Sequence, residues 1–472
     1  MHLQISIAET CMRQKKSAAA DGCPQTQEAE KECLLIMTKG RRLYVLSVDS
    51  MMTEDLAFMR TLPAFGRVLQ NAAVVSNIIS VYPTLTYTIH ATMMTGVYPD
   101  RHHIVNNETF LPGQEKTPWY RSRNHFDPDV RSILEEAKRA GYTTAAICWP
   151  VTADMDVDWH LPETWSRQEG NQAMYQEFVR CGAQPSFLDE FWPEYGRSLT
   201  GLGEPYFSLV THGAALAAIR RHKAEVIFEH LSMVDHTRHS YGVYGKQVYR
   251  NAYLEAEMML SETLGALEAA GVLEDTTIVI TSDHGQTPVR KLVAPNLFLA
   301  RDGFISASPD GEISSWRAVF HSAAHSAQVY LSDPGDEALK KEVYGLLCSY
   351  RDSGEAGIAQ IFTKEEAKER CHLEGDFSFV VEGEADCSFA NRVSGAAVVQ
   401  ADNSDYKYSV ATHGHLPETG PKPAMILSGP GIRAGARVDG VSIVDEAPTL
   451  AALLGISLGE PDGKPIREVL DI

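Results

Sequence analysis

The sequence lacks the features that mark secreted and membrane-spanning proteins. Its eight cysteines are scattered without a CxxC pair, which in a chain of 472 residues favours reduced thiols over a disulfide framework. No apolar run reaches the ~18 residues needed to cross a bilayer. The basic residues near the N-terminus are not followed by the apolar stretch of ~7–15 residues that a secretory signal requires. We therefore expect a cytoplasmic protein with no membrane partner.

Positive charge is also scarce. The chain has 42 Lys and Arg against 62 Asp and Glu, so its formal net charge is −20. Because phosphate backbones are bound through Lys and Arg, this balance excludes a general nucleic-acid surface. Bound metal cations would still reverse the field within a local site. A hydrophobic content of 44% is ordinary for a globular enzyme, and the length suits a core with a sizeable insertion.

The pattern along the chain predicts an α/β protein. Residues 1–40 are expected to form a poorly structured tail, with Met37 as an alternative start. From 41 to 294 apolar strands alternate with amphipathic helices, which is typical of a mainly parallel sheet sandwiched between helices. Between 295 and 408 the rhythm changes to short alternating segments, interpreted as an inserted α+β cap. The catalytic core is expected to resume over 409–472.

Individual elements can be placed by their apolar runs. Strands are predicted at 43–48, 226–231 and 277–281, each a nearly continuous apolar run. A helix is predicted over 55–70, followed by a strand over 73–81. In an open α/β sheet, ligand-binding groups collect at the carboxyl ends of such strands.

Side chains of the types that bind metal ions follow these apolar runs. They are far apart in the sequence, and only a folded sheet could bring them together. The set holds enough imidazole and carboxylate for two divalent ions, with one hydroxyl that could lie between them. Its members are Asp49, Thr86, Asp235, His239, Asp283, His284 and His413. This combination favours metal-assisted transfer of a phosphoryl-type group.

The spacing of the ligands leaves their pairing open. Asp235 and His239 are four residues apart, so on a helix they share one face and could grip one ion. Asp283 and His284 are neighbours, which point apart on a regular strand. They share an ion only if the strand ends in a turn there, which Gly285 permits; otherwise each reaches a different ion.

The ligand types indicate the metal and the chemistry. Mixed His and carboxylate ligation suits zinc, with manganese or iron as alternatives. A divalent cation can lower the pKa of the Thr86 hydroxyl and stabilise its alkoxide as a nucleophile. The amide of Asn107 offers a donor to a phosphoryl oxygen. Asn106 stands beside it, which leaves this assignment open by one residue.

Five separated motifs together resemble the alkaline phosphatase superfamily. They are Asp49, PTLTYTIHATMMTGVYPDRHHIVNN at 83–107, DHTRH at 235–239, SDHG at 282–285 and THG at 412–414. The resemblance covers nearly all of the chain after residue 41, and it is greatest to the nucleotide pyrophosphatase/phosphodiesterase branch.

This resemblance implies a site with two zinc ions. It assigns to one ion Asp49, Thr86, Asp283 and His284. It assigns to the other ion Asp235, His239 and His413. Thr86 would attack phosphorus and form a phospho-threonine intermediate, which water then hydrolyses. Asn107 and the backbone N–H beside Thr86 would hold a non-bridging oxygen.

Two positions bear on specificity. Tyr87 matches the aromatic residue that usually follows the nucleophile in this branch, so it is a predicted substrate-binding residue. His230 stands where the branch usually has a tyrosine that helps to sandwich a nucleobase. The resemblance therefore supports the predicted metal ligands and nucleophile, but it does not support specificity for a nucleobase.

The predicted function is a metal-dependent phosphodiesterase or nucleotide pyrophosphatase acting on a small-molecule phosphate ester, with a nucleotide as one candidate. A phosphonate C–P hydrolase or a phosphomonoesterase on the same scaffold is the alternative. No basic residue lies between Thr86 and Asp100, which favours diesters over more highly charged monoesters. A sulfatase would need a Cys/Ser-x-Pro-x-Arg motif, which is absent. A non-catalytic metal-binding protein is the alternative from another class, and the oligomeric state stays open.

Overall fold

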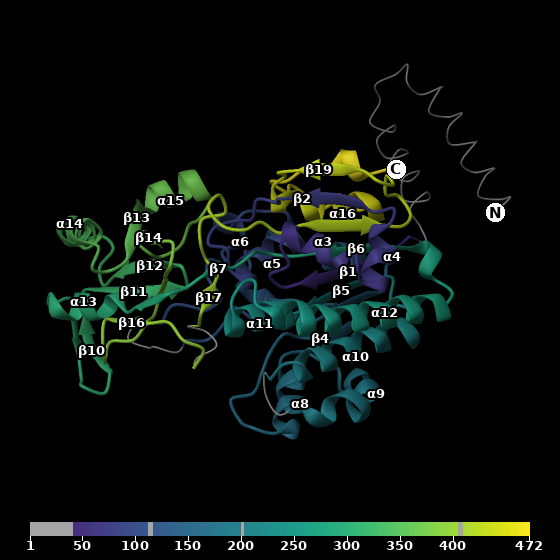
Figure 1. The fold of residues 1–472 in the computed structure, drawn as a ribbon, viewed down its shortest axis with the longest axis horizontal. Helices are drawn as coiled ribbons and strands as arrows, with labels where there is room; N and C mark the ends of the chain where they lie inside the picture. Colours follow the sequence, from purple (N-terminus) through teal and green to yellow (C-terminus); the bar gives the residue numbers. More distant parts are fainter. Residues whose placement is uncertain (1–40, 112–116, 200–202, 405–408) are drawn as a thin grey trace, which may run out of the picture.

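The structure, a computed structural model, describes residues 41–111, 117–199, 203–404 and 409–472. The predicted tail over 1–40 lies outside the described residues. Figure 1 shows a large lobe built on a wide sheet, with a smaller lobe beside it. In the described part of the chain, no helix is both long and apolar enough to span a bilayer.

The large lobe contains one eight-stranded sheet with the order β19-β2-β18-β6-β1-β5-β3-β4. Strand β18 runs antiparallel to both of its neighbours, and the other adjacent pairs are parallel. The strands are β1 (Arg42–Val48), β2 (Ala73–Ser76), β3 (Thr144–Ile147), β4 (Trp159–Leu161), β5 (Val226–Leu231), β6 (Thr276–Thr281), β18 (Met425–Ser428) and β19 (Arg437–Asp439). The expected mainly parallel sheet is confirmed.

Strand β1 sits at the centre of this sheet, and its register aligns the ends of three strands. Val48 at the end of β1 pairs with Leu231 at the end of β5, and Ser47 pairs with Thr281 at the end of β6. Every residue of β5 and β6 is buried, as expected of strands covered on both faces. The residues that follow the three strands therefore emerge side by side.

Helices cover both faces of the sheet, and each face has its own apolar core. One core includes residues of α4 (Pro63–Leu69), α10 (Tyr206–Arg220) and α12 (Tyr253–Ala269). The other includes residues of α5 (Thr86–Thr95), α7 (Ile133–Arg139) and α16 (Glu446–Leu454). Helix α5 ends at Gly96, whose φ of +71° is a left-handed conformation that glycine adopts without strain.

Two predicted elements were wrong in extent. The helix predicted over 55–70 is broken into a 3-10 turn, α3 (Leu56–Met59) and α4, because Pro63 begins a new helix instead of continuing the old one. The strand predicted over 73–81 stops at Ser76, since Asn77 adopts a positive φ of 51° that ends the extended run.

The smaller lobe is an α+β unit with its own core. Its four-stranded sheet has the order β11-β12-β14-β13, all antiparallel. The elements are α13 (Pro295–Arg301), β11 (Ala318–Ala323), β12 (Ser326–Leu331), α14 (Glu337–Ser353), β13 (Ile358–Thr363), α15 (Lys364–Cys371) and β14 (Phe379–Gly383). Its core also takes in Tyr82 and Val105 from the large lobe, so the two lobes pack together. The exact division at residues 295 and 408 stays a prediction.

A buried carboxyl group links α16 to the sheet. Glu446 is 1% exposed and accepts a hydrogen bond of 2.9 Å from the Thr281 hydroxyl. Burial, chiefly, raises the pKa of Glu446 from 4.5 to about 8. The folded protein therefore holds a proton on this group more tightly than the unfolded chain does.

This shift predicts a pH dependence of stability. Because unfolding releases the proton, the free energy of unfolding should fall as pH rises from 4.5 to about 8. The slope from one such group is at most about 1.4 kcal/mol per pH unit. Glu446→Gln, with no charge to bury, should flatten it. Urea unfolding of chelator-treated protein across this pH range measures the slope, and the exposed Glu312→Gln is the control. An unaltered slope in Glu446→Gln would contradict the assignment.

Candidate metal centre and its cavity

The carboxyl ends of the central strands carry the predicted ligands. Asp49 directly follows β1, Asp283 and His284 follow β6, and Asp235 lies on α11 (Met233–Tyr241) just after β5. Thr86 is the first residue of α5. The structure thus brings together at one sheet edge side chains that are up to several hundred residues apart in sequence.

One cluster is formed by two carboxylates and a histidine. Ligand atoms of Asp49, Asp283 and His284 all lie within 4.8 Å of one another. The Nε2 atom of His284 is 3.2 Å from Asp283 Oδ2 and 3.6 Å from Asp49 Oδ1. The Thr86 hydroxyl lies 3.3 Å from the same nitrogen. The hydroxyl is therefore placed at the edge of this cluster.

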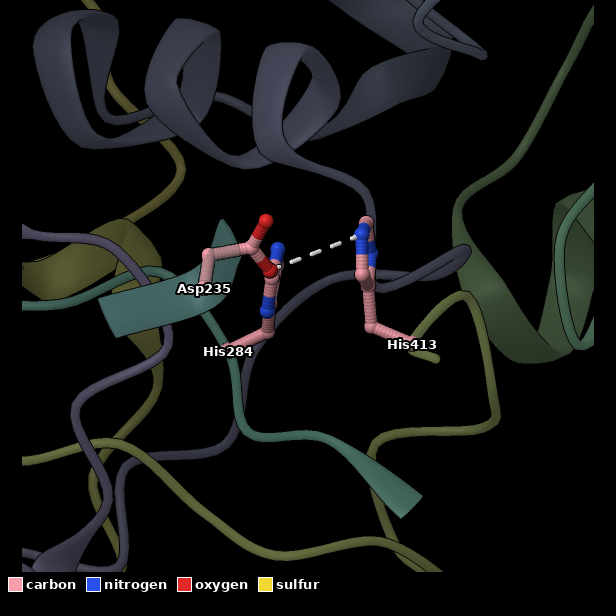
Figure 2. Close-up of side chains that lie close together, drawn as sticks. All are labelled: Asp235, His284 and His413. Atoms are coloured by element: carbon pink, nitrogen blue, oxygen red, sulfur yellow. Dashed lines mark ion pairs between the residues drawn. The ribbon is translucent and has the colours of Figure 1, made fainter. Parts of the chain in front are cut away.

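A second cluster shares His284 with the first. Ligand atoms of Asp235, His284 and His413 also lie within 4.8 Å of one another, as Figure 2 shows. The rings of His284 and His413 stack with centroids 3.9 Å apart. His239 Nε2 lies 3.3 Å from Asp235 Oδ2, on the helical spacing expected of that pair. His284 therefore lies between the clusters, so its position does not assign it to one ion.

Backbone carbonyls orient two of the histidines. The Nδ1 atom of His239 lies 2.7 Å from the Ala411 carbonyl, and that of His413 lies 2.8 Å from the Thr84 carbonyl. With Nδ1–H donating, each ring turns its Nε2 toward Asp235, an arrangement common in metal sites. The residue after His413, Gly414, packs tightly against β11 of the smaller lobe. A Cβ at this position would lie 1.9 Å from the Ala323 carbonyl oxygen, so only glycine fits there.

A buried ion pair fixes α11 against the loop after β1. Arg238, between the two α11 ligands, donates two hydrogen bonds of 2.8 Å to Asp55, and both side chains are fully buried. Arg238 also donates to the Ser50 carbonyl. The Tyr253 hydroxyl donates to the same carboxylate at 2.7 Å. These bonds connect the helix that carries Asp235 to the residue that follows Asp49.

The pKa values of the clustered groups are shifted from their ordinary values. Burial, and after it the charge of Asp283, raises the pKa of Asp49 well above its ordinary value. Burial, and then His413, lowers the pKa of His284. For Asp235 burial works in the opposite direction, yet His239 and the other histidines lower its pKa well below the ordinary value.

Unsatisfied oxygen atoms are a second feature of the clusters. Asp49 Oδ1 and Asp283 Oδ2 are buried and receive no hydrogen bond within the described residues. No Lys or Arg of the described part of the chain forms an ion pair with either carboxylate. Buried carboxylates in that state are costly unless a metal or a proton compensates them. The donor set of oxygens and imidazoles fits divalent metal ions.

The amide of Asn107 is fixed beside the helix that begins at Thr86. Its Oδ1 accepts a hydrogen bond of 2.9 Å from the backbone N–H of Tyr87. That N–H, expected to hold a phosphoryl oxygen, is thus already bonded to the protein. Because Asn107 Oδ1 accepts this bond, the Asn107 NH2 group is the donor that could reach a phosphoryl oxygen. Asn106 instead donates to Ser322 in the smaller lobe at 3.1 Å, which favours Asn107 over Asn106.

A cavity of about 400 Å³ opens beside these residues. It is lined by members of the predicted site, among them Thr86, Tyr87 and Asn107. His230 also lines it, with Nε2 3.4 Å from Asp49 Oδ2. His230 therefore contacts a predicted ligand directly.

Sequence reasoning missed several cavity residues. Trp119, Glu163, Trp165, Glu204 and Phe207 line the cavity but were not predicted site residues. They come from segments with neither clear periodicity nor a motif, so no signal in the sequence singled them out. Only the aromatic richness of residues 150–225 was visible.

The sheet, its helices and the ligand clusters define an α/β protein with an alkaline-phosphatase-like fold. The chain belongs to the type I phosphodiesterase / nucleotide pyrophosphatase family, whose model matches residues 43–415. The resemblance inferred from the motifs is therefore confirmed.

Similar proteins agree with this membership. Human ectonucleotide pyrophosphatase/phosphodiesterase family member 1 is 21% identical over 50% of this chain and 23% of its own length. Mouse bis(5'-adenosyl)-triphosphatase is 23% identical over 53% of this chain and 48% of its own length. This chain thus spans about a quarter of the first relative and about half of the second.

Solved structures show the same fold. Murine ectonucleotide pyrophosphatase/phosphodiesterase 5 superposes with a TM-score of 0.62 at 18% identity, covering 91% of this chain and all of that chain. An inactive variant of the murine protein, with one threonine replaced by alanine, has been solved in complex with AMP and superposes equally well.

Replacing one of the paired carboxylates should have opposite effects on the metal-free and the metal-loaded protein. Asp49→Asn removes repulsion from Asp283, so the metal-free variant should unfold at a temperature no lower than wild type. It also removes a ligand, so metal should raise its unfolding temperature less, and fewer ions should bind per chain. Thermal unfolding and metal analysis measure both effects.

The control for this substitution is Asp310→Asn. Asp310 is exposed, lies outside the cavity and belongs to none of the groups of side chains that could hold a metal ion. Its removal should alter neither metal content nor the metal-dependent stabilisation. A metal-dependent rise in unfolding temperature as large in Asp49→Asn as in wild type would exclude Asp49 as a ligand.

Proposed function

We propose that the protein is a hydrolase of phosphoric diester or phosphoanhydride bonds that depends on two divalent metal ions, with zinc as the expected metal. One observation carries the proposal: the Thr86 hydroxyl lies at the N-terminus of α5, 3.3 Å from His284 Nε2, and lines a cavity. A nucleophile, a metal-ligand cluster and space for a substrate therefore coincide.

The residues of the site would have separate roles. When bound, the divalent ions would supply charge stabilisation and favour the alkoxide form of a coordinated hydroxyl. Those residues able to hold them are Asp49, Thr86, Asp235, His239, Asp283, His284 and His413. The Thr86 hydroxyl lies 3.3 Å from His284 Nε2 and lines the cavity, which supports a position next to a bound phosphoryl group.

Catalysis then proceeds in two displacements. Thr86 Oγ1 forms a bond to phosphorus while the bond to the leaving oxygen breaks, which gives a phospho-threonine. The Asn107 amide donates to a non-bridging oxygen, and the Tyr87 N–H holds that amide in orientation. Water subsequently cleaves the new ester and regenerates the Thr86 hydroxyl.

Several observations support a diester or anhydride substrate. A mouse relative is a bis(5'-adenosyl)-triphosphatase, and a protein of the same fold was solved with AMP. That the AMP complex used an inactive threonine variant fits a nucleophilic threonine in this scaffold. The residues described around the cavity include no Lys or Arg, and a phosphomonoesterase would need added positive charge. A nucleotide is one candidate within this class of small-molecule esters.

The nucleophile assignment predicts the behaviour of Thr86→Ala. Its turnover of bis-p-nitrophenyl phosphate should fall by about 10³-fold or more, because the covalent route is lost. Metal content should stay near that of wild type, since most ligands remain. Thr86→Ser, which keeps a hydroxyl, should retain measurable turnover.

The competing functions give other outcomes in the same assay. Activity near wild type in Thr86→Ala would exclude the covalent mechanism. A preference for p-nitrophenyl phosphate over the diester would move the function to a phosphomonoesterase. Turnover of a phosphonate but no ester would indicate C–P hydrolysis. Metal binding with no turnover of any of these would favour a binding protein.

A further inference from the structure

Gln286 is a fully buried polar residue two positions after His284. Its Nε2 group donates two hydrogen bonds to Asp235, one to the backbone carbonyl at 3.1 Å and one to the carboxylate oxygen Oδ1. Gln286 therefore reaches from the loop after β6, which carries two predicted ligands, to α11, which carries Asp235 and His239. A single amide group thus connects the two ligand clusters.

The two acceptors on Asp235 fix the direction in which this amide faces. If the amide of Gln286 were turned over, its Oε1 would face a carbonyl and an ionised carboxylate, neither of which can donate a hydrogen bond. With Nε2 facing Asp235, Oε1 is buried and receives no hydrogen bond within the described residues. A buried acceptor without a donor is costly, so the side chain is held here by its bonds to Asp235.

The neighbouring residues hold the backbone of Gln286 in place. Gly285 packs so closely that a Cβ there would lie 2.6 Å from the Pro421 carbonyl oxygen. On the other side, Thr287 pairs with Thr412 in an antiparallel bridge. The amide therefore projects from a backbone that is fixed on both sides, and the fold itself sets its position relative to α11.

The bond to Oδ1 places the two carboxylate oxygens of Asp235 in different surroundings. Oδ2 lies 3.3 Å from His239 Nε2. Two ligand atoms about 2.0–2.1 Å from one zinc ion are about 3.3–3.4 Å apart in a tetrahedral arrangement. Oδ1 lies 3.9 Å from His413 Nε2, the pair joined by the dashed line in Figure 2, which exceeds this spacing. The geometry therefore suits coordination of an ion through Oδ2 alone.

A carboxylate that binds through one oxygen limits the number of ligands around an ion. Zinc favours four ligands, and in catalytic sites three protein ligands leave one position for water or substrate. Manganese instead favours six-coordinate sites rich in oxygen, to which a chelating carboxylate would contribute two ligand atoms. A hydrogen bond that occupies Oδ1 therefore favours zinc over manganese.

We propose that Gln286 is a positioning residue that holds Asp235 as a one-oxygen ligand and so gives the ion site at Asp235, His239 and His413 its preference for zinc over manganese. Hydrogen bonds to metal ligands orient them and tune the affinity of the site in this way. This inference rests on the metal dependence of the proposed function and adds the residue that selects the ion. It does not depend on which ester is hydrolysed.

A purely structural role for Gln286 is the alternative. Its bonds to Asp235 would then only fix α11 against the loop after β6, and their loss would weaken the binding of every ion by a similar factor. A role in selecting the ion predicts unequal effects. Comparing two ions in one variant therefore cancels any general loosening of the site.

The test is Gln286→Met, which keeps the length and approximate volume of the side chain and removes both hydrogen bonds. Chelator competition with metal-free protein would give the dissociation constants for zinc and for manganese. We expect one zinc constant to rise about 10–100-fold, the usual effect of losing such a partner. The corresponding manganese constant should rise less, because the released Oδ1 can then chelate the larger coordination shell.

The matched control is Gln172→Met. Gln172 is exposed on α8 (Asn171–Arg180) and does not line the cavity, so both constants should stay at their wild-type values. Equal weakening of zinc and manganese binding in Gln286→Met would overturn the selectivity and leave the structural role. Unchanged constants for both ions would reject any influence of Gln286 on the metal site.

The same proteins distinguish this inference from the proposed function. Zinc selectivity that depends on Gln286, without turnover of bis-p-nitrophenyl phosphate, would keep the role of Gln286 and reject the diesterase function. Turnover by wild type with equal weakening of both ions in Gln286→Met would do the reverse. A wild-type protein that binds neither ion would reject both.

A crystal structure of zinc-loaded wild type tests the inference without a variant, and so covers the case in which Gln286→Met fails to fold. Zinc should be bound to Asp235 Oδ2, with the Gln286 amide still donating to Oδ1. Coordination through both oxygens of Asp235, or a Gln286 side chain turned away from Oδ1, would overturn the proposal.

Discussion

Asp49 and Asp283 follow neighbouring parallel strands, so the register of β1 and β6 forces their carboxylates into one buried space. Neither has a Lys or Arg partner within the described residues, and each keeps a buried oxygen without a hydrogen bond. Burial, and after it the repulsion between the two charges, raises the pKa of Asp49. The surrounding features hold this unfavourable pair in place: the Arg238–Asp55 ion pair fixes α11, and the carbonyl-bound histidines fix the facing side. A bound cation would therefore relieve the repulsion at this edge of the sheet.

The sheet and the side chains gathered at its edge could be predicted because their signals are local. Each strand is an apolar run with a carboxylate just past its end, as at Asp49 and Asp283, and topology then brings those ends together. The break at Pro63 was also visible in the sequence, yet the apolar spacing on both sides of it favoured one helix. The position of His284 between two clusters depends on how β6 ends, which spacing alone leaves open. Likewise, only the folded geometry shows that the Tyr87 N–H is bonded to Asn107.

The cavity wall was not predictable for a different reason. Trp119, Glu163 and Phe207 come from three separate segments, and none lies in a motif or on a periodic face that points to a site. A buried carboxylate is recognisable as unusual only when its neighbours are known. In the structure those neighbours are a tyrosine hydroxyl at Glu163 and serine hydroxyls at Glu204, and not basic groups. Substrate specificity thus resides in tertiary contacts, whereas the reaction type resides in motifs.

Positive charge at the reaction centre would depend on bound metal. Imidazoles and carboxylates gather around Thr86, and divalent ions held there would make this part of the cavity attractive to a phosphoryl group. No Lys or Arg is among the described residues that line the cavity, so the protein itself supplies no permanent cation there. The Asn107 amide is the remaining group that could orient a phosphoryl oxygen, and the Tyr87 N–H holds it in position. Metal binding and the fixed amide would therefore together align phosphorus with the Thr86 hydroxyl.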